Sequence, residues 1–268
     1  MKKRLLILED GSVYEGKAFG SDNYRMGELI FQSGISGYQE IISDSSYYGQ
    51  IVMMTYPAIG NCGINRDDFE GLSPQLFGLV VKEYCEEPSN WRSDATLDEF
   101  MKLKNIAGIA DIDTREITRK IRDHGVLKAM MADEDADVEA IVKMMKETEL
   151  LSDGVAKVST QKPFPIPSRG KKVVLVDIGT KYAVIREFNM RGCDLMVVPY
   201  NMSAEDILAI HPDGIVYAGG PGSPYDIEET ITNAKALLGK CPIMATGLGH
   251  EVLAVALGAS VKKMKVGH

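Results

Sequence analysis

A stretch near the end of the chain, "CPIMATGLGHEVLAVALG" (residues 241–258), reads as a buried strand, a tight glycine-rich turn and an apolar helix. Many enzymes use this strand–turn–helix arrangement to hold a nucleophile at the tip of a sharp elbow. The tip here, Thr246 to His250, has no Cys or Ser where the nucleophile would be expected. The pattern therefore predicts either a different chemistry or an enzyme architecture without its reacting atom.

A second glycine-rich turn, "AGGPGSP" (residues 218–224), follows another predicted strand. Its glycines let backbone N–H groups face a bound anion or a developing negative charge. Taken alone, the same turn is typical of an ordinary strand-to-helix connection. The chain has neither a GxGxxG nor a Walker A pattern, so the sequence does not favour a dinucleotide or nucleoside triphosphate site.

The remaining histidines and cysteines form no recognisable ligand set. His124, His211 and His268 are isolated by their spacing, and His250 is predicted to cap or pack near its helix start because no nucleophile lies beside it. Cys241 precedes its strand and is predicted to be a buried, inert thiol. The four cysteines contain no CxxC pair, which indicates free thiols in a reducing compartment and no metal site.

Composition bounds the possible partners. The 268 residues carry a formal net charge of −8, which disfavours nucleic acid or an anionic membrane as the main partner. The apolar run Leu5–Leu8 stops at Glu9 and is too short for a signal peptide. No apolar run approaches the roughly 20 residues of a membrane span. We therefore expect a soluble, cytoplasmic protein.

Residues 1–150 are predicted to form a β-rich domain. Residues 5–20 indicate a hairpin that turns at Asp10 and Gly11. Residues 113–125 indicate a helix that Asp113 caps, with Glu116 completing a capping box. A further amphipathic helix over residues 137–150 is expected to be the last of this domain.

The pattern of predicted secondary structure changes after a proline-rich stretch. Residues 151–170, with prolines at 163, 165 and 167, are predicted to be an extended linker. Residues 171–268 then alternate strands and helices, beginning with "KKVVLVDIG". This order predicts a doubly wound parallel sheet, whose ligands bind at the carboxyl ends of the strands, where both glycine-rich turns lie.

With these residues in view, the chain resembles a known family: the small, glutamine-hydrolysing subunit of carbamoyl-phosphate synthetase. The first domain carries "FQSGISGYQEIISDSSYYGQIVMMTYPAIGNCG", "NWRS" and "IAGIADIDTREITRKIRDHG". The second carries "PDGIVYAGGPGSP", "PIMATGLGHEVLAVALGA" and "KMKVGH". The resemblance implies an α/β protein, with a small-chain N-terminal domain followed by an incomplete, doubly wound class I glutamine amidotransferase domain.

The resemblance also implies a function. In the family, a Cys–His–Glu triad hydrolyses glutamine, and the ammonia passes to a large subunit that makes carbamoyl phosphate for arginine and pyrimidine synthesis. The first domain mainly serves the association with that subunit. No cofactor is implied for this chain, since ATP and Mg belong to the large subunit. The residues implied to contact glutamine are Ser46, Gly220, Gly222, Leu248 and Glu251.

Several positions depart from the family pattern. The nucleophilic Cys is replaced by Gly247 and the following Gln by Glu251, while Gly219 and Ser223 replace an Asn and an Asp around the other turn. The family segment that supplies the triad His and Glu would follow His268. Glycine tolerates the strained backbone of an elbow, so we expect the turn to persist and the glutaminase chemistry to be lost.

Three alternatives remain open at this point. The lost chemistry fits natural decay better than an engineered knockout, which would typically be a single change. The chain is either a catalytically silent small subunit or a non-catalytic docking or regulatory protein that binds a synthetase large subunit. A third possibility is an unrelated small-anion binder that uses the turn at residues 219–224.

Overall fold

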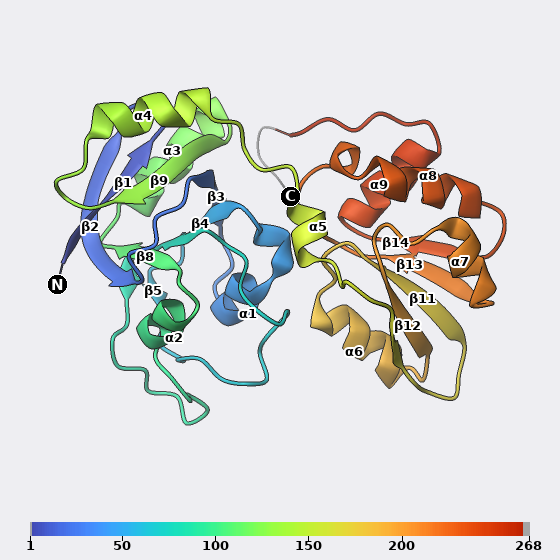
Figure 1. The fold of residues 1–268 in the computed structure, drawn as a ribbon. Coiled ribbons are helices and arrows are strands. Elements are labelled where there is room, and N and C mark those ends of the chain that lie inside the picture. The colour runs from blue at the N-terminus through green and yellow to red at the C-terminus, as the bar shows by residue number, and fades with distance from the viewer. Residues whose placement is uncertain (1, 265–268) are drawn as a thin grey trace. The chain divides into compact units, whose positions relative to one another are not determined.

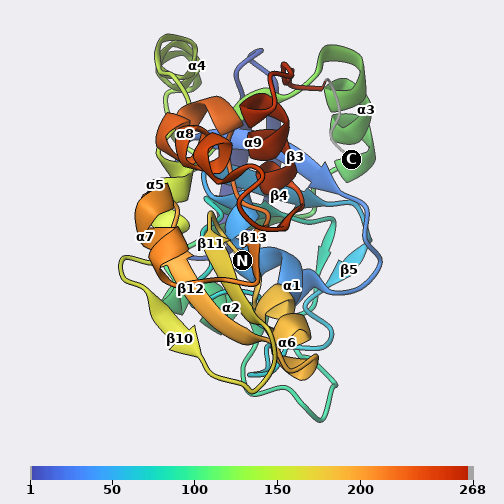
Figure 2. The same ribbon diagram turned by 90° about the vertical axis from the view of Figure 1, so that its right-hand side faces the viewer.

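The computed structural model describes residues 2–264, which divide into two compact units (Figures 1 and 2). One unit comprises the chain up to Leu151 together with Met264, and the other comprises Ser152–Lys263. His268 and most of the terminal "KMKVGH" stretch lie outside the described residues.

The first unit is built on a closed barrel, which leaves its strands without a free edge. The strands in spatial order are β1 (Lys3–Leu8), β2 (Val13–Gly20), β8 (Ala107–Ala110), β6 (Gly78–Val80), β4 (Gln50–Met54), β3 (Gly27–Gln32) and β9 (Leu127–Ala132). A separate two-stranded sheet pairs β5 (Ala58–Ile59) with β7 (Glu83–Tyr84).

Alternation along the barrel strands directs side chains to different cores. Leu6 and Leu8 of β1 join a cluster that draws on the other barrel strands and on helix α3 (Thr114–His124). Leu5 and Ile7 point the other way, toward helix α4 (Val138–Glu147). The pattern follows from the period of two in a β-strand. Three further short helices are α1 (Tyr38–Ser43), η1 (Ser45–Tyr47) and α2 (Leu97–Leu103).

The predicted hairpin and helix cap of this unit are confirmed, with one correction. β1 and β2 pair antiparallel, and the Asp113 carboxylate accepts a hydrogen bond from the Glu116 N–H at 3.0 Å. The Glu116 side chain does not complete a capping box. Its carboxylate instead accepts from the Tyr14 hydroxyl at 3.0 Å, because β2 brings that phenol to the start of the helix.

The second unit is a five-stranded sheet with helices on both faces. Its order is β10 (Phe164–Ile166), β12 (Asp194–Pro199), β11 (Lys172–Asp177), β13 (Gly214–Tyr217) and β14 (Ile243–Ala245), parallel except for β10. The helices are α5 (Gly154–Val158), α6 (Tyr182–Met190), α7 (Ala204–Ala209), η2 (Pro224–Asp226), α8 (Glu228–Leu237) and α9 (Leu248–Ala256). In Figure 1, α6 lies on one face of the sheet and α7, α8 and α9 lie on the other.

The expected linker contributes structure to this second unit. Residues 164–166 form β10, which pairs antiparallel with β12 at the edge of the sheet. Residues 154–158 form α5, and the buried Ser159 accepts a hydrogen bond from the Tyr200 N–H at 3.1 Å. The extended backbone that prolines favour is also that of an edge strand, where a missing N–H does no harm.

No helix within residues 2–264 is long and apolar enough to cross a bilayer. All four cysteines are free thiols.

Candidate active site

A sharp elbow joins β14 to α9, as the sequence predicts. Gly247 forms its tip with φ 54° and ψ −130°, a combination that side chains with a Cβ atom rarely adopt. The His250 N–H donates to the Gly247 carbonyl at 3.0 Å and so starts the helix immediately. The elbow presents an exposed glycine at the carboxyl end of the sheet, with no side chain at its tip.

The end of β13 holds this elbow in place. The Thr246 N–H donates to the Tyr217 carbonyl at 3.0 Å, and the Gly249 N–H donates to the Ala218 carbonyl at 2.9 Å. A Cβ atom at Gly249 would lie 2.4 Å from the Tyr217 carbonyl oxygen. Glycine at this position therefore lets the helix start approach the strand closely.

The Gly-Pro-Gly turn that follows β13 packs against its neighbours by the same means. A Cβ atom at Gly220 would lie 1.8 Å from the Ile178 carbonyl oxygen, so only glycine fits there. Gly222 is exposed and takes φ 81°. Ser223 caps η2, and its N–H donates to the Asp226 carboxylate at 2.9 Å. Ser223, where the resemblance implies an Asp, therefore has a structural role.

A third loop, which the sequence does not predict, also reaches this place. Residues 178–180 follow β11, and a Cβ atom at Gly179 would lie 2.9 Å from the Gly220 Cα atom. The Asp177 carboxylate accepts the Thr180 N–H at 2.9 Å and shapes the loop. Its position at the carboxyl end of the first parallel strand is the signal that could have identified it.

The first turn of α9 supplies the polar groups beside the elbow. The N–H of the buried Leu248 is the first of the helix, a position that has no carbonyl partner within the helix. The half-buried Glu251 lies one turn further on. Burial raises the pKa of its carboxyl group, and the adjacent His250 partly opposes that change. His250 itself is exposed, which differs from the predicted packing role.

Two other predicted residues do not belong to these turns. Ser46 belongs to the first unit, where it is half-buried in η1 and its N–H donates to the Asp44 carboxylate at 2.9 Å. Cys241 precedes β14 at the end opposite the elbow, and it is half-buried rather than buried. Burial raises the pKa of its thiol, which disfavours the reactive thiolate.

Among residues 2–264, no group of three or more His, Cys, Asp or Glu side chains could hold a metal ion. The site therefore consists of three backbone turns that lie close together, the carboxyl group of Glu251, and an elbow tip, Gly247, that has no side chain. Such turns can direct N–H groups at an anion, but they cannot attack a carbon atom.

Two protein-family models match this chain. Residues 6–131 match the model described as carbamoyl-phosphate synthase small chain, CPSase domain, and residues 174–268 match glutamine amidotransferase class-I. The chain belongs to the carbamoyl-phosphate synthase small chain family. The second match includes the elbow and the Gly-Pro-Gly turn, so the candidate site lies within the amidotransferase part of the chain.

Curated relatives agree along the whole chain. The carbamoyl phosphate synthase pyrimidine-specific small chain of Bacillus subtilis (strain 168) is 54% identical over 266 residues, which cover 99% of this chain and 73% of that one. The carbamoyl phosphate synthase small chain of Oceanobacillus iheyensis is 53% identical over 268 residues, or 100% of this chain and 73% of the relative. A solved aminopeptidase from Aneurinibacillus sp. strain AM-1 aligns with a TM-score of only 0.28 at 11% identity, over 94% of this chain and 69% of its own.

Proposed function

We propose that this chain is the small subunit of a glutamine-dependent carbamoyl-phosphate synthase and that it does not hydrolyse glutamine by itself. Membership of the small-chain family supports the first part. The single observation that supports the second is Gly247, which occupies the tip of an intact elbow without a side chain.

The chemistry explains why that one atom matters. In the family reaction a thiolate attacks the amide carbon of glutamine, forms a thioester and releases ammonia. Glycine offers no nucleophile, so no thioester can form at residue 247. The nearest cysteine in sequence, Cys241, lies at the opposite end of β14 and cannot substitute for the missing thiol.

The rest of the site is proposed to keep its relation to glutamine. Ser46, Gly220, Gly222, Leu248 and Glu251 are the residues assigned to glutamine contact. Glu251 places a carboxylic acid where the family has a neutral amide, which we expect to weaken binding of the substrate when ionised. The chain itself is proposed to bind no cofactor; ATP and Mg are assigned to the large subunit.

The proposal is tested by ammonia release from glutamine, measured with and without the large synthetase subunit from the same organism. We expect no release above background, while the large subunit still makes carbamoyl phosphate from added ammonia. Release that a thiol reagent abolishes would overturn the proposal. The variant Gly247→Cys is the informative control, because the N-terminus of α9 lowers the pKa of a thiol there. An electrophilic glutamine analogue should label this variant and leave the unmodified chain unlabelled.

The second candidate function, a non-catalytic docking protein, has one observation in its favour. The first unit is a closed barrel that carries an almost fully exposed tryptophan, Trp91. Stable binding to the large subunit with no change in its ammonia-dependent rate would favour the small-subunit role, whereas a change in that rate would favour a regulatory role.

A further inference from the structure

Two loops of the first unit run side by side on its surface. Residues 86–94 are tied to residues 61–68 by backbone bonds, from the Ser89 N–H to the Asn61 carbonyl at 3.2 Å and from the Asp94 N–H to the Ile64 carbonyl at 2.8 Å. The Arg92 guanidinium adds a bond of 3.1 Å to the Asp68 carboxylate. The loop is thus positioned by contacts on both sides of Trp91.

These contacts do not bury the side chain of Trp91. Its side chain is 92% exposed, although it is the single tryptophan of the protein. A buried indole removes roughly 150–250 Å² of surface from water, and tryptophan dominates the energetics of many protein interfaces. A tryptophan that is exposed on an anchored loop is therefore suited to bind another protein.

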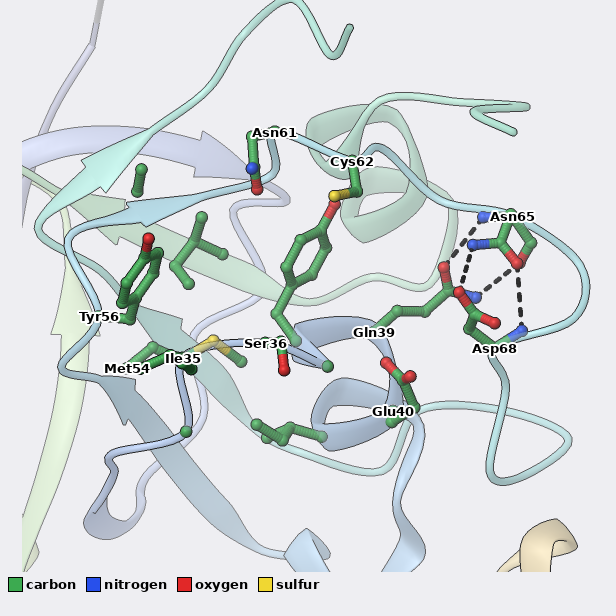
Figure 3. Close-up of a pocket in the computed structure, with 16 residues that line it drawn as sticks. Ile35, Ser36, Gln39, Glu40, Met54, Tyr56, Asn61, Cys62, Asn65 and Asp68 are labelled. Atoms are coloured by element: carbon green, nitrogen blue, oxygen red, sulfur yellow. Dashed lines mark hydrogen bonds between the residues drawn. The ribbon is translucent and has the colours of Figure 1, made fainter. Parts of the chain in front are cut away.

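The segment that anchors this loop also forms one wall of a pocket of about 250 Å³. Figure 3 shows Ile35, Met54 and Tyr56 on one side of this pocket and Glu40, Asn65 and Asp68 on the other. Ile35 is 76% exposed and Tyr56 is 40% exposed, so apolar side chains lie at its mouth. Residues 61–68 thus contact the Trp91 loop and also line the pocket that carries these apolar side chains.

The charge of this region is negative. Residues 61–68 and 86–94 carry five carboxylates and two guanidinium groups. The pocket lining contains no lysine, arginine or histidine, and the carboxylate of Glu40, which lines it, forms no ion pair among the described residues. A partner would gain most by placing basic side chains here.

We propose that this surface, the Trp91 face, docks the large synthetase subunit; it comprises Ile35, Glu40, Tyr56, Asp67, Asp68 and Trp91. The complementary surface of the large subunit would hold an apolar depression for the indole and a lysine or arginine side chain opposite Glu40, since Asp67 and Asp68 already pair with Arg92. The inference rests on the proposed function, since that function supplies the partner.

Charge argues against other occupants. Nucleic acid and anionic membranes are repelled by an acidic face. A second copy bound through the same face would bring like carboxylates together, which costs free energy. A basic protein surface is the remaining class that fits both the charge and the exposed indole.

The test measures the Kd between the full chain and the large subunit at low and at high salt, with one of the two immobilised. We expect Trp91→Ala to weaken binding at least tenfold and Glu40→Gln to weaken it less, with a smaller salt dependence than the unmodified chain. The matched control is Leu103→Ala, which removes another highly exposed apolar side chain of the same unit and should leave the Kd unchanged.

The outcomes separate the two proposals. If the unmodified chain does not bind the large subunit, the proposed function fails. If it binds and Trp91→Ala behaves like Leu103→Ala, the Trp91 face is refuted while the proposed function stands. Concentration-dependent dimerisation that Trp91→Ala abolishes would assign the face to a second copy instead. Because Trp91 is so exposed, the variant should fold normally, which thermal denaturation checks.

Discussion

A Cβ atom at Gly247 would lie 3.1 Å from the Cα atom of Gly219. These are the two positions where the resemblance implies a lost Cys and a lost Asn, and the structure brings them together at the ends of β14 and β13. The two positions therefore belong to one place in the fold. Neither carries a side chain, so that backbone faces backbone there.

This relationship predicts the cost of restoring a side chain. Gly247→Ala should lower the free energy of unfolding by about 1–3 kcal/mol, because φ 54° with ψ −130° is strained for alanine and its Cβ atom presses on Gly219. Gly239→Ala is the control, since it also has a positive φ of 74° but meets nothing within 4 Å. Denaturant titration of both variants should show the larger loss at residue 247; equal losses would argue against the contact with Gly219.

The Gly-Pro-Gly turn allows a sharper comparison. Gly220→Ala should destabilise the second unit by at least about 2 kcal/mol, because its Cβ atom would overlap the Ile178 carbonyl oxygen at 1.8 Å and backbone cannot move aside cheaply. In Gly214→Ala the nearest atom, the Pro242 carbonyl oxygen, is 3.6 Å away. That variant should change stability by less than about 1 kcal/mol. Hydrogen exchange of the second unit measures both, and similar protection in the two variants would contradict the tight packing.

Local patterns in the sequence predict much of this fold. The hairpin at Asp10 and Gly11 and the alternating strands and helices after residue 171 both depend on neighbours in the chain, and both are confirmed. Closure of the barrel depends on distant pairings such as Leu29 with Leu127, which no local pattern encodes. The strand at residues 164–166 was missed for the same reason, since only its pairing with β12 distinguishes it from a linker.

The candidate site divides in the same way. The elbow at Gly247 is readable from one short stretch, because strand, turn and helix follow one another directly. Its contact with Gly219 requires β13 and β14 to be neighbours in the sheet, with Tyr217 opposite Ala245, although helix α8 lies between them in the chain. The exposure of Trp91 likewise depends on the folded surface, and the neighbouring residues in the sequence do not predict it.

Glu251 predicts a pH dependence of stability. Burial raises the pKa of its carboxyl group above the ordinary value of 4.5, so the folded state holds the proton more tightly than the unfolded state. The free energy of unfolding should therefore fall as the pH rises from about 4.5 through the folded pKa. In Glu251→Gln this decline should disappear, and the variant should be more stable than the unmodified chain above that range.

The control for this titration has the opposite sign. The Lys171 ammonium bonds the Asp213 carboxylate at 2.9 Å and lowers its pKa, so that contribution is present above the ordinary carboxyl pKa and is lost as the pH falls through the folded pKa. In Asp213→Asn the free energy of unfolding should fall less steeply as the pH decreases through the acidic range. Urea midpoints measured from pH 3 to pH 8 resolve both effects; a decline that persists in Glu251→Gln would show that another group causes it.

Two tyrosines predict stability changes of opposite sign. The Tyr217 hydroxyl is completely buried and has no hydrogen-bond partner in the described structure, whereas the Tyr38 hydroxyl donates to the Gly63 carbonyl at 2.5 Å. An unsatisfied buried hydroxyl costs free energy, so Tyr217→Phe should raise the free energy of unfolding by about 1 kcal/mol. Tyr38→Phe should lower it by a similar amount. Denaturation followed by circular dichroism measures both, and a loss of stability in Tyr217→Phe would mean that its hydroxyl binds a buried water molecule.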